Sequence, residues 1–153
     1  MSYWLFKTEP DEYSIDDLAS EKKGYAVWNG IRNYQARNFL RDEVKKGDAV
    51  LIYHSSCKPA SIVGIGKVVK AAYVDPEQFD SSNHYYDNKA SEEKPRWYCV
   101  DVAFVKKFAR PLPLAGIKKT PELANMLLLK QPRLSIVPVT EQEFQIIIKM
   151  AES

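Results

Sequence analysis

The sequence predicts an α+β domain built around a strongly curved or barrel-like mixed β-sheet flanked by helices. Two observations predict this class. Short apolar or alternating runs typical of β-strands recur along the chain, and the helical patterns among them rarely connect two strands as crossovers. The 153 residues fit one hydrophobic core, so we expect a single domain over residues 1–153.

The N-terminal part of the chain predicts two strands and a short helix. Residues 3–8 alternate aromatic and aliphatic side chains and should form the first strand. A short helix should follow over 14–18, because Ser14 is a favoured N-cap residue. The apolar run at 25–28 predicts a second strand, which ends at an Asn-Gly pair.

The middle of the chain predicts one longer helix and three further strands. Apolar residues recur with a helical period over 31–44. Apolar runs at 49–54 and 62–69 and an alternating run at 97–104 predict strands. The polar segment 75–96 is too long for an ordinary connection, which favours a functional role.

The C-terminal part predicts two helices separated by an edge strand. A Thr-Pro pair at 120–121 should open a helix that runs to about Leu129. The run 134–138 predicts an edge strand, because its final proline cannot donate to a ladder. Thr140 with Glu143 matches a capping box for the last helix.

The charge of the chain limits how it can contact nucleic acid. Its formal net charge is only +2. A protein that holds long nucleic acid by the phosphates shows a larger basic excess, because each neutralised phosphate contributes through counterion release. A nucleic-acid contact should therefore be short and centred on a base, although the same charge suits a small-molecule binder.

Several function classes lack their sequence signals. The chain has neither the basic region and cleavage site of a signal peptide nor ~20 consecutive apolar residues, so we expect a cytoplasmic protein with no membrane partner. Cys57 and Cys99 lie in contexts that do not support a disulfide. The two cysteines and two histidines are not paired as zinc ligands, so we expect no metal, no cofactor and no zinc deaminase.

The segment His54-Ser55-Ser56-Cys57 places a base beside three potential nucleophiles. Neighbours on an extended chain point to opposite faces, so adjacency in sequence does not make a catalytic pair. We interpret the segment as the polar end of a strand and its loop, and we do not expect an enzyme.

The strongest local signal for binding lies around Trp28. It stands directly before Asn29 and Gly30 and the start of a predicted helix, where amide groups can offer directional hydrogen bonds. Stacking a base on an aromatic ring is worth ~1–3 kcal/mol. A core position for Trp28 fits the same pattern. Lys7 and Glu9 can share one face of the first strand, as binding residues or as an exposed ion pair.

Long stretches of the chain resemble the EVE domain family. The resemblance runs in order from about residue 2 to residue 150. The matching stretches are Tyr3-Trp4-Leu5-Phe6-Lys7-Thr8-Glu9-Pro10, Trp28-Asn29-Gly30-Ile31-Arg32-Asn33-Tyr34-Gln35-Ala36-Arg37-Asn38-Phe39-Leu40, Tyr53-His54-Ser55, Val63-Gly64-Ile65, Pro95-Arg96-Trp97-Tyr98 and Gln131-Pro132-Arg133-Leu134-Ser135.

This resemblance implies a PUA-like fold and a bacterial, stand-alone type without a long basic N-terminal extension. EVE domains are similar to YTH domains, which hold N6-methyladenine of RNA in an aromatic cage. The family is associated with recognition of modified bases, including modified cytosines in DNA. Carried over to this chain, Lys7 and Thr8 line the pocket, Trp28 is a cage wall, and Asn29 follows it.

The combined hypothesis is a non-catalytic, monomeric module that binds a modified nucleobase in DNA or RNA, or a modified nucleotide. Trp28 stacks on the base, Asn29 and Asn33 read its edge, and Lys7 with Arg32 or Arg37 contacts phosphate or carbonyl groups. The remaining residues of the predicted site are Thr8, Glu9, Tyr34, His54, Ser55, Tyr85, Tyr86 and Trp97. Among these, Trp97, Tyr85 and Tyr86 are the candidates for the other cage walls.

Two alternatives stay open at this point. One is an enzyme that acts on a modified nucleotide, with Glu9 or His54 as general base. The other is a receptor for a small anionic metabolite, with Lys7 and Arg37 as a charged floor.

Overall fold

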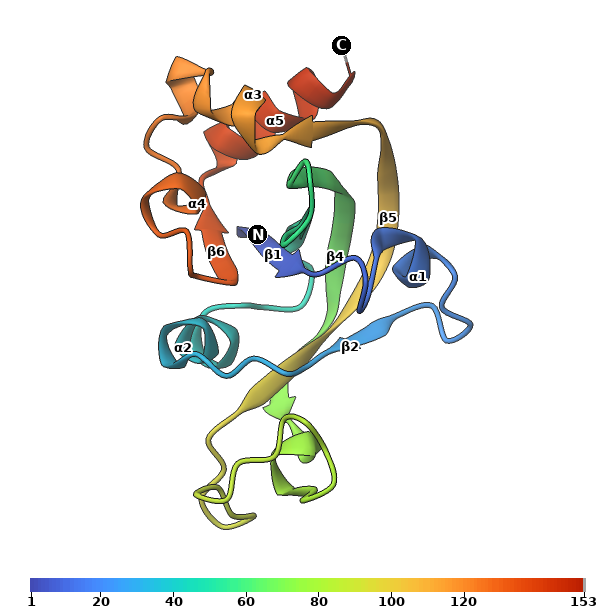
Figure 1. Cartoon of the computed structure of the whole chain (residues 1–153), viewed down its shortest axis with the longest axis vertical. Helices are drawn as coiled ribbons and strands as arrows, with labels where there is room; N and C mark the ends of the chain where they lie inside the picture. The colour runs from blue at the N-terminus through green and yellow to red at the C-terminus, as the bar shows by residue number, and fades with distance from the viewer. Residues whose placement is uncertain (153) are drawn as a thin grey trace.

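The computed structural model describes residues 1–152, which form a six-stranded mixed sheet with helices around it (Figure 1). The strand order is β2-β5-β4-β3-β1-β6. The strands are β1 (Tyr3–Thr8), β2 (Ala26–Trp28), β3 (Ala49–His54), β4 (Ser61–Val74), β5 (Tyr98–Pro113) and β6 (Ile136–Val139). The helices are α1 (Ile15–Ala19), α2 (Tyr34–Asp42), α3 (Leu114–Lys118), α4 (Leu127–Lys130) and α5 (Glu141–Glu152), with 3₁₀ turns at Pro76–Phe79 and Pro121–Leu123.

The α+β class is confirmed, but the sheet is not closed into a barrel. Strands β2 and β6 remain at its two edges. The long antiparallel pair β4–β5 contains four register shifts. Because such bulges bend a strand and increase its twist, they curve the sheet without closing it.

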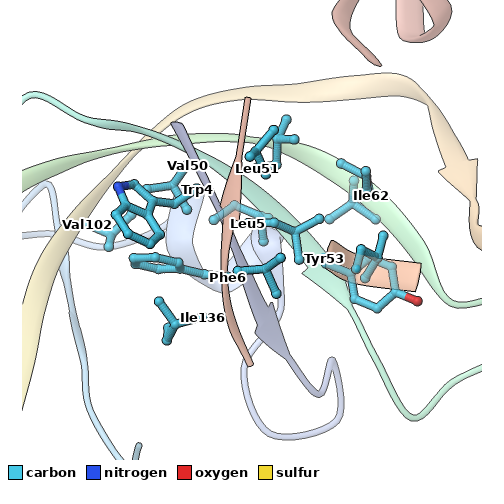
Figure 2. Close-up of a cluster of buried hydrophobic side chains, with 14 of the residues drawn as sticks. Trp4, Leu5, Phe6, Val50, Leu51, Tyr53, Ile62, Val102 and Ile136 are labelled. Carbon is cyan, nitrogen blue, oxygen red and sulfur yellow. The ribbon is translucent and has the colours of Figure 1, made fainter. Parts of the chain in front are cut away.

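The parallel pair β1–β3 lies inside the sheet, with β6 on one side and β4 on the other. Leu5 and Phe6 of β1 and Leu51 of β3 are completely buried. Figure 2 shows Leu5 and Phe6 among side chains of β3, together with Ile136 of β6. A strand covered on both faces reads as a nearly continuous apolar run, which is why β3 does not alternate.

The predicted N-cap Ser14 and the predicted capping box of Thr140 with Glu143 are both confirmed, and Ser14 also forms a capping box. The Ser14 side chain accepts from the Asp17 amide, and the Asp17 carboxylate accepts from the Ser14 amide. At the start of α5, the Thr140 amide donates to Glu143 Oε1 at 3.0 Å, and the Glu143 amide donates to Thr140 Oγ1 at 3.1 Å. The predicted edge strand is confirmed as β6, in which a proline lies opposite Trp4 of β1.

Two predicted helices have different bounds. The helix expected over 31–44 is shorter, because Asn33 is extended and its Oδ1 accepts from the Ala36 amide, so α2 begins at Tyr34. The helix expected over 120–129 is broken into a 3₁₀ turn and α4; the Thr120 hydroxyl donates to the Gly116 carbonyl instead of capping.

Strands β4 and β5 continue well beyond the predicted 62–69 and 97–104. Their outer ends are largely exposed and carry Lys and Arg, which apolar patterning does not detect. Pairing of the two strands with each other supplies the backbone hydrogen bonds that keep these polar ends extended.

The polar segment 75–96 joins β4 to β5 and extends away from α3 and α5, at the lower end of Figure 1. Its fold depends on Gln78, which is fully buried. The Gln78 amide nitrogen donates to the carbonyls of Asp75 and Trp97, and its oxygen accepts from the amides of Arg96 and Trp97. One side chain therefore closes the two ends of the segment.

Both cysteines are free thiols, with Cys99 buried and Cys57 partly exposed. No helix within residues 1–152 is long and apolar enough to span a membrane.

Candidate functional site

A cavity of about 610 Å³ opens where β1, β2 and β3 end. Its volume falls within the ~300–1,000 Å³ typical of small-molecule sites. The lining comes from five stretches of chain that are far apart in sequence. It comprises Lys7, Thr8, Glu9, Glu12, Tyr13, Val27, Trp28, Asn29, Gly30, Ile31, Arg32, Ser55, Ser56, Tyr85, Pro132, Arg133 and Ser135.

The parallel pairing of β1 and β3 brings the first two of these stretches together. Thr8 and His54 are register partners at the ends of their strands, so residues 7–9 and 55–56 leave the sheet at the same edge. The Lys7 ammonium donates to the Pro132 carbonyl at 2.8 Å, and burial lowers its pKa. An ammonium has three donors, so this bond leaves Lys7 able to donate to a ligand.

Trp28 is both a core residue and part of the cavity wall. Only 7% of its surface is exposed, and its ring packs 5.7 Å from the ring of Phe6 and 6.3 Å from that of Tyr13. The next residue, Asn29, is half-buried and lines the cavity, and its side chain makes no hydrogen bond within residues 1–152. The sequence left two interpretations of Trp28, a core residue and a wall of the pocket, and this position combines them.

Tyr85 reaches the cavity from the segment 75–96 and lies against Gly30. A Cβ atom at Gly30 would be 2.8 Å from the Tyr85 ring, and the φ angle of +75° is one that other residues rarely adopt. Glycine is therefore required here for the ring to lie so close to the backbone. Of the two adjacent tyrosines in this segment, Tyr85 lines the cavity, whereas Tyr86 is 44% exposed and does not.

Arg32 lines the cavity, but its guanidinium is occupied by the protein. Its Nε and Nη2 donate to the Tyr85 carbonyl at 3.0 and 2.8 Å, and its Nη1 donates to the Asp75 carboxylate at 3.0 Å. The Asp75 side chain is completely buried and also accepts from the Gly30 amide. Arg32 thus positions Tyr85, and its contact with a phosphate or carbonyl group of a ligand stays a prediction.

Tyr34, Arg37 and Trp97, also predicted for the site, form a separate cluster outside the cavity. The Tyr34 and Trp97 rings stack with centroids 4.9 Å apart, and the Arg37 guanidinium lies 4.8 Å from the Tyr34 centroid. Trp97 is 5% exposed, and its Nε1 donates to Asp87 at 2.7 Å. The cluster attaches the end of the segment 75–96 to α2.

Asn33 and His54 also lie outside the cavity lining. Asn33 is the N-cap of α2, as described above, and its Oδ1 is occupied by that role. His54 Nε2 accepts from the Ile15 amide at 3.1 Å, which requires the neutral ring. Desolvation by burial is the main cause that lowers the His54 pKa; Lys107 acts in the same direction and Asp16 in the opposite one.

This lowered pKa predicts a loss of stability in mild acid. A histidine with a depressed pKa in the folded state contributes stability above its unfolded value near 6.5, and the contribution falls as pH drops below that value. We expect the free energy of unfolding to decrease more steeply below pH 6.5 in the wild-type protein than in His54→Gln. Urea unfolding from pH 7.5 to 5 measures this, and parallel curves would contradict it.

Several lining residues were not predicted from the sequence: Glu12, Tyr13, Val27, Gly30, Ile31, Ser56, Pro132, Arg133 and Ser135. The last three belong to a stretch that resembles the EVE domain family, so the resemblance contained a signal for them. The sequence contained no signal for Tyr13, because this residue reaches the cavity through a turn in which Thr8 Oγ1 donates to the Tyr13 carbonyl. No group of His, Cys, Asp and Glu side chains within residues 1–152 is arranged to hold a metal ion.

Comparisons with known proteins agree with this architecture. The chain is 41% identical over 168 residues to human thymocyte nuclear protein 1, with 99% of this chain and 74% of the human protein covered. A crystal structure of human THYN1 protein in complex with 5-methylcytosine-containing DNA superposes with a TM-score of 0.95, at 40% identity over 100% of this chain and 99% of that chain.

A protein from Pseudomonas putida is also similar, with a TM-score of 0.92 and 46% identity over 98% of this chain and 99% of that chain. The Mmi1 YTH domain superposes with a TM-score of 0.50 and 12% identity over 99% of this chain and 88% of that chain, which shows a likeness of fold alone. A sequence model of the EVE domain matches residues 2–150. The chain therefore belongs to the EVE domain family.

Proposed function

We propose that this protein binds a modified nucleobase of DNA or RNA in the cavity, with a modified cytosine in DNA as the preferred ligand, and that it catalyses no reaction. One observation supports this most directly. The cavity brings two aromatic rings from distant parts of the chain, Trp28 and Tyr85, to polar side chains that are unpaired within residues 1–152, namely Asn29, Glu9 and Arg133. The human relative was crystallised with 5-methylcytosine-containing DNA.

The polar groups suit a cytosine edge. A carboxylate accepts from the exocyclic amino group of cytosine, and an amide side chain supplies both a donor and an acceptor. Glu9 and Asn29 provide these two groups in the cavity. Aromatic faces contribute stacking and an apolar surface for an added methyl group.

One residue of each alternative to base binding lies away from the cavity. His54 is outside the cavity lining and its Nε2 accepts a backbone hydrogen bond, so Glu9 is the candidate general base that the enzyme alternative retains. Arg37 lies in the cluster with Tyr34 and Trp97, so it forms no charged floor with Lys7. Incubation with 5-methyl-2′-deoxycytidine should leave the nucleoside unchanged by mass spectrometry, and its conversion would establish an enzyme.

The adjacent tyrosines provide a matched test of the binding site. Tyr85→Ala removes an aromatic wall, so we expect the affinity for a single-stranded oligonucleotide with one 5-methylcytosine to fall about 5- to 150-fold, the equivalent of ~1–3 kcal/mol per stacked base. Tyr86→Ala changes a neighbouring exposed ring and should bind like the wild type. Fluorescence anisotropy with methylated and unmethylated oligonucleotides of the same sequence measures the affinities of both variants. A parallel experiment uses RNA oligonucleotides with and without one N6-methyladenine.

Two outcomes would contradict the proposal. One is equal affinity of the wild-type protein for modified and unmodified oligonucleotides in both the DNA and the RNA arm. The other is an equal effect of the two tyrosine substitutions on affinity, which would show that the base does not bind in the cavity.

A further inference from the structure

A smaller hollow of about 300 Å³ adjoins the cavity. It is lined by Asn33, Gln35, Gln131, Pro132, Arg133 and Leu134. Pro132 and Arg133 line both hollows, so the two are adjacent, with this pair of residues at their boundary. The smaller volume is at the lower limit for small-molecule sites, which suits one flat base rather than a longer ligand.

The chemistry of this hollow matches a nucleotide. Its polar side chains are three amides and one guanidinium, and it contains no carboxylate. The side chains of Gln35 and Gln131 make no hydrogen bond within residues 1–152. Arg133 is exposed and likewise forms no hydrogen bond or ion pair there, so its donors are available to a phosphate at the boundary of the two hollows.

A third hollow, of about 520 Å³, adjoins the cavity through Glu12 and Tyr13 and has the opposite charge character. Its lining includes three carboxylates, those of Glu12, Asp17 and Glu21, against two lysines. Carboxylates repel the phosphates of a nucleic-acid strand. The charges thus distinguish the two possible paths for a strand whose base occupies the cavity.

We infer that the hollow of Asn33, Gln35, Gln131, Pro132, Arg133 and Leu134 is a second subsite, which takes the base of one nucleotide adjacent to the modified base. Arg133 binds the phosphate that links the two nucleotides, and the amides of Gln35 and Gln131 contact the neighbouring base. The inference rests on the proposed function and deepens it. With one such subsite, the affinity for the modified base should depend on the neighbouring nucleotide on one side only.

The first test compares probes that contain or lack a neighbour. The probes are 5-methyl-2′-deoxycytidine, a single-stranded oligonucleotide with one central 5-methylcytosine, and two versions of it with an abasic sugar on the 5′ or the 3′ side. Loss of one neighbouring base should weaken binding by about 5- to 10-fold, in the range of one or two net hydrogen bonds from the amides of Gln35 and Gln131. Loss of the other neighbour should change the affinity less than about twofold.

The second test uses variants with matched controls. Gln35→Ala and Gln131→Ala should lower the affinity for the oligonucleotide several-fold and leave the affinity for the nucleoside unchanged. Gln145→Ala, an exposed glutamine of α5, is the control. Arg133→Ala should also lower the slope of log affinity against log salt by ~0.7, the value for one phosphate of a single strand. The control is Arg110→Ala, which replaces an exposed arginine of β5 outside all three hollows and should leave this slope unchanged.

The outcomes separate the subsite from the function on which it rests. Wild-type affinity in the Gln35 and Gln131 variants, or no effect of either abasic sugar, would overturn the subsite while the Tyr85→Ala result still supports the cavity. An equal loss for nucleoside and oligonucleotide would also overturn it, since those side chains would then act on the cavity. A wild-type protein without preference for the methylated probe would overturn both proposals.

Discussion

Asp75→Ala is expected to lower the free energy of unfolding by about 3 kcal/mol, one of the two largest effects in this chain. The Asp75 carboxylate is completely buried and accepts from the Arg32 guanidinium and from the amides of Gly30 and Glu77. Alanine leaves all three donors without this acceptor and leaves the Arg32 charge without its partner. Urea unfolding that yields both the midpoint and the slope measures the loss.

The matched control is Asp80→Ala, in the same segment. Asp80 is exposed and its carboxylate accepts only from Ser82, so its replacement should change the free energy of unfolding by less than about 1 kcal/mol. Asp75→Ala should also weaken methylcytosine binding, because Arg32 then loses one of the bonds that position it against Tyr85. A loss of stability below about 1 kcal/mol would show that this buried network contributes little.

Trp28→Ala is expected to cost about 3–5 kcal/mol, the range for removing a large buried aromatic side chain. The ring is 7% exposed and packs against Phe6 and Tyr13, so alanine opens a space in the core. The same change removes an aromatic wall of the cavity, so discrimination between methylated and unmethylated oligonucleotides should disappear even under conditions where the variant is folded.

Trp28→Phe separates the two effects. It retains a flat apolar ring and should lose less stability, with a reduced but measurable preference for the methylated oligonucleotide. Thermal and urea unfolding give the stability, and anisotropy under folded conditions gives the preference. Unchanged stability of Trp28→Ala would show that the packing around the ring readjusts. Unchanged discrimination between the methylated and unmethylated oligonucleotides would show that Trp28 does not contact the base.

The fold was predictable where local patterns coincide with packing. The strand at residues 3–8, the N-cap Ser14, the capping box of Thr140 and the edge strand with its proline were predicted from local signals, and the structure confirms each. The extended ends of β4 and β5 were not predictable, because their backbone hydrogen bonds come from each other rather than from an apolar pattern.

The site was predictable only in part for a related reason. Lys7 to Glu9 and Trp28 to Arg32 are continuous motifs, and both line the cavity. Tyr34 and Trp97 have the same residue types as a cage wall, but they stack on each other instead. Only tertiary geometry distinguishes an aromatic pair that anchors a segment from one that faces a ligand. Tyr13 and Arg133 reach the cavity through turns and long-range packing that no local pattern records.

The pairing of β6 with β1 has a consequence for how the protein is made. Residues 3–6 lie against residues 136–139, so β1 keeps an unpaired edge in the nascent chain until residues 136–139 have been translated. Pairing between such distant segments also slows folding, because a long loop must close before the contact is gained. Pro132, Arg133 and Ser135 directly precede this last strand. The cavity is thus completed only after the strands β1 to β5 have already left the ribosome.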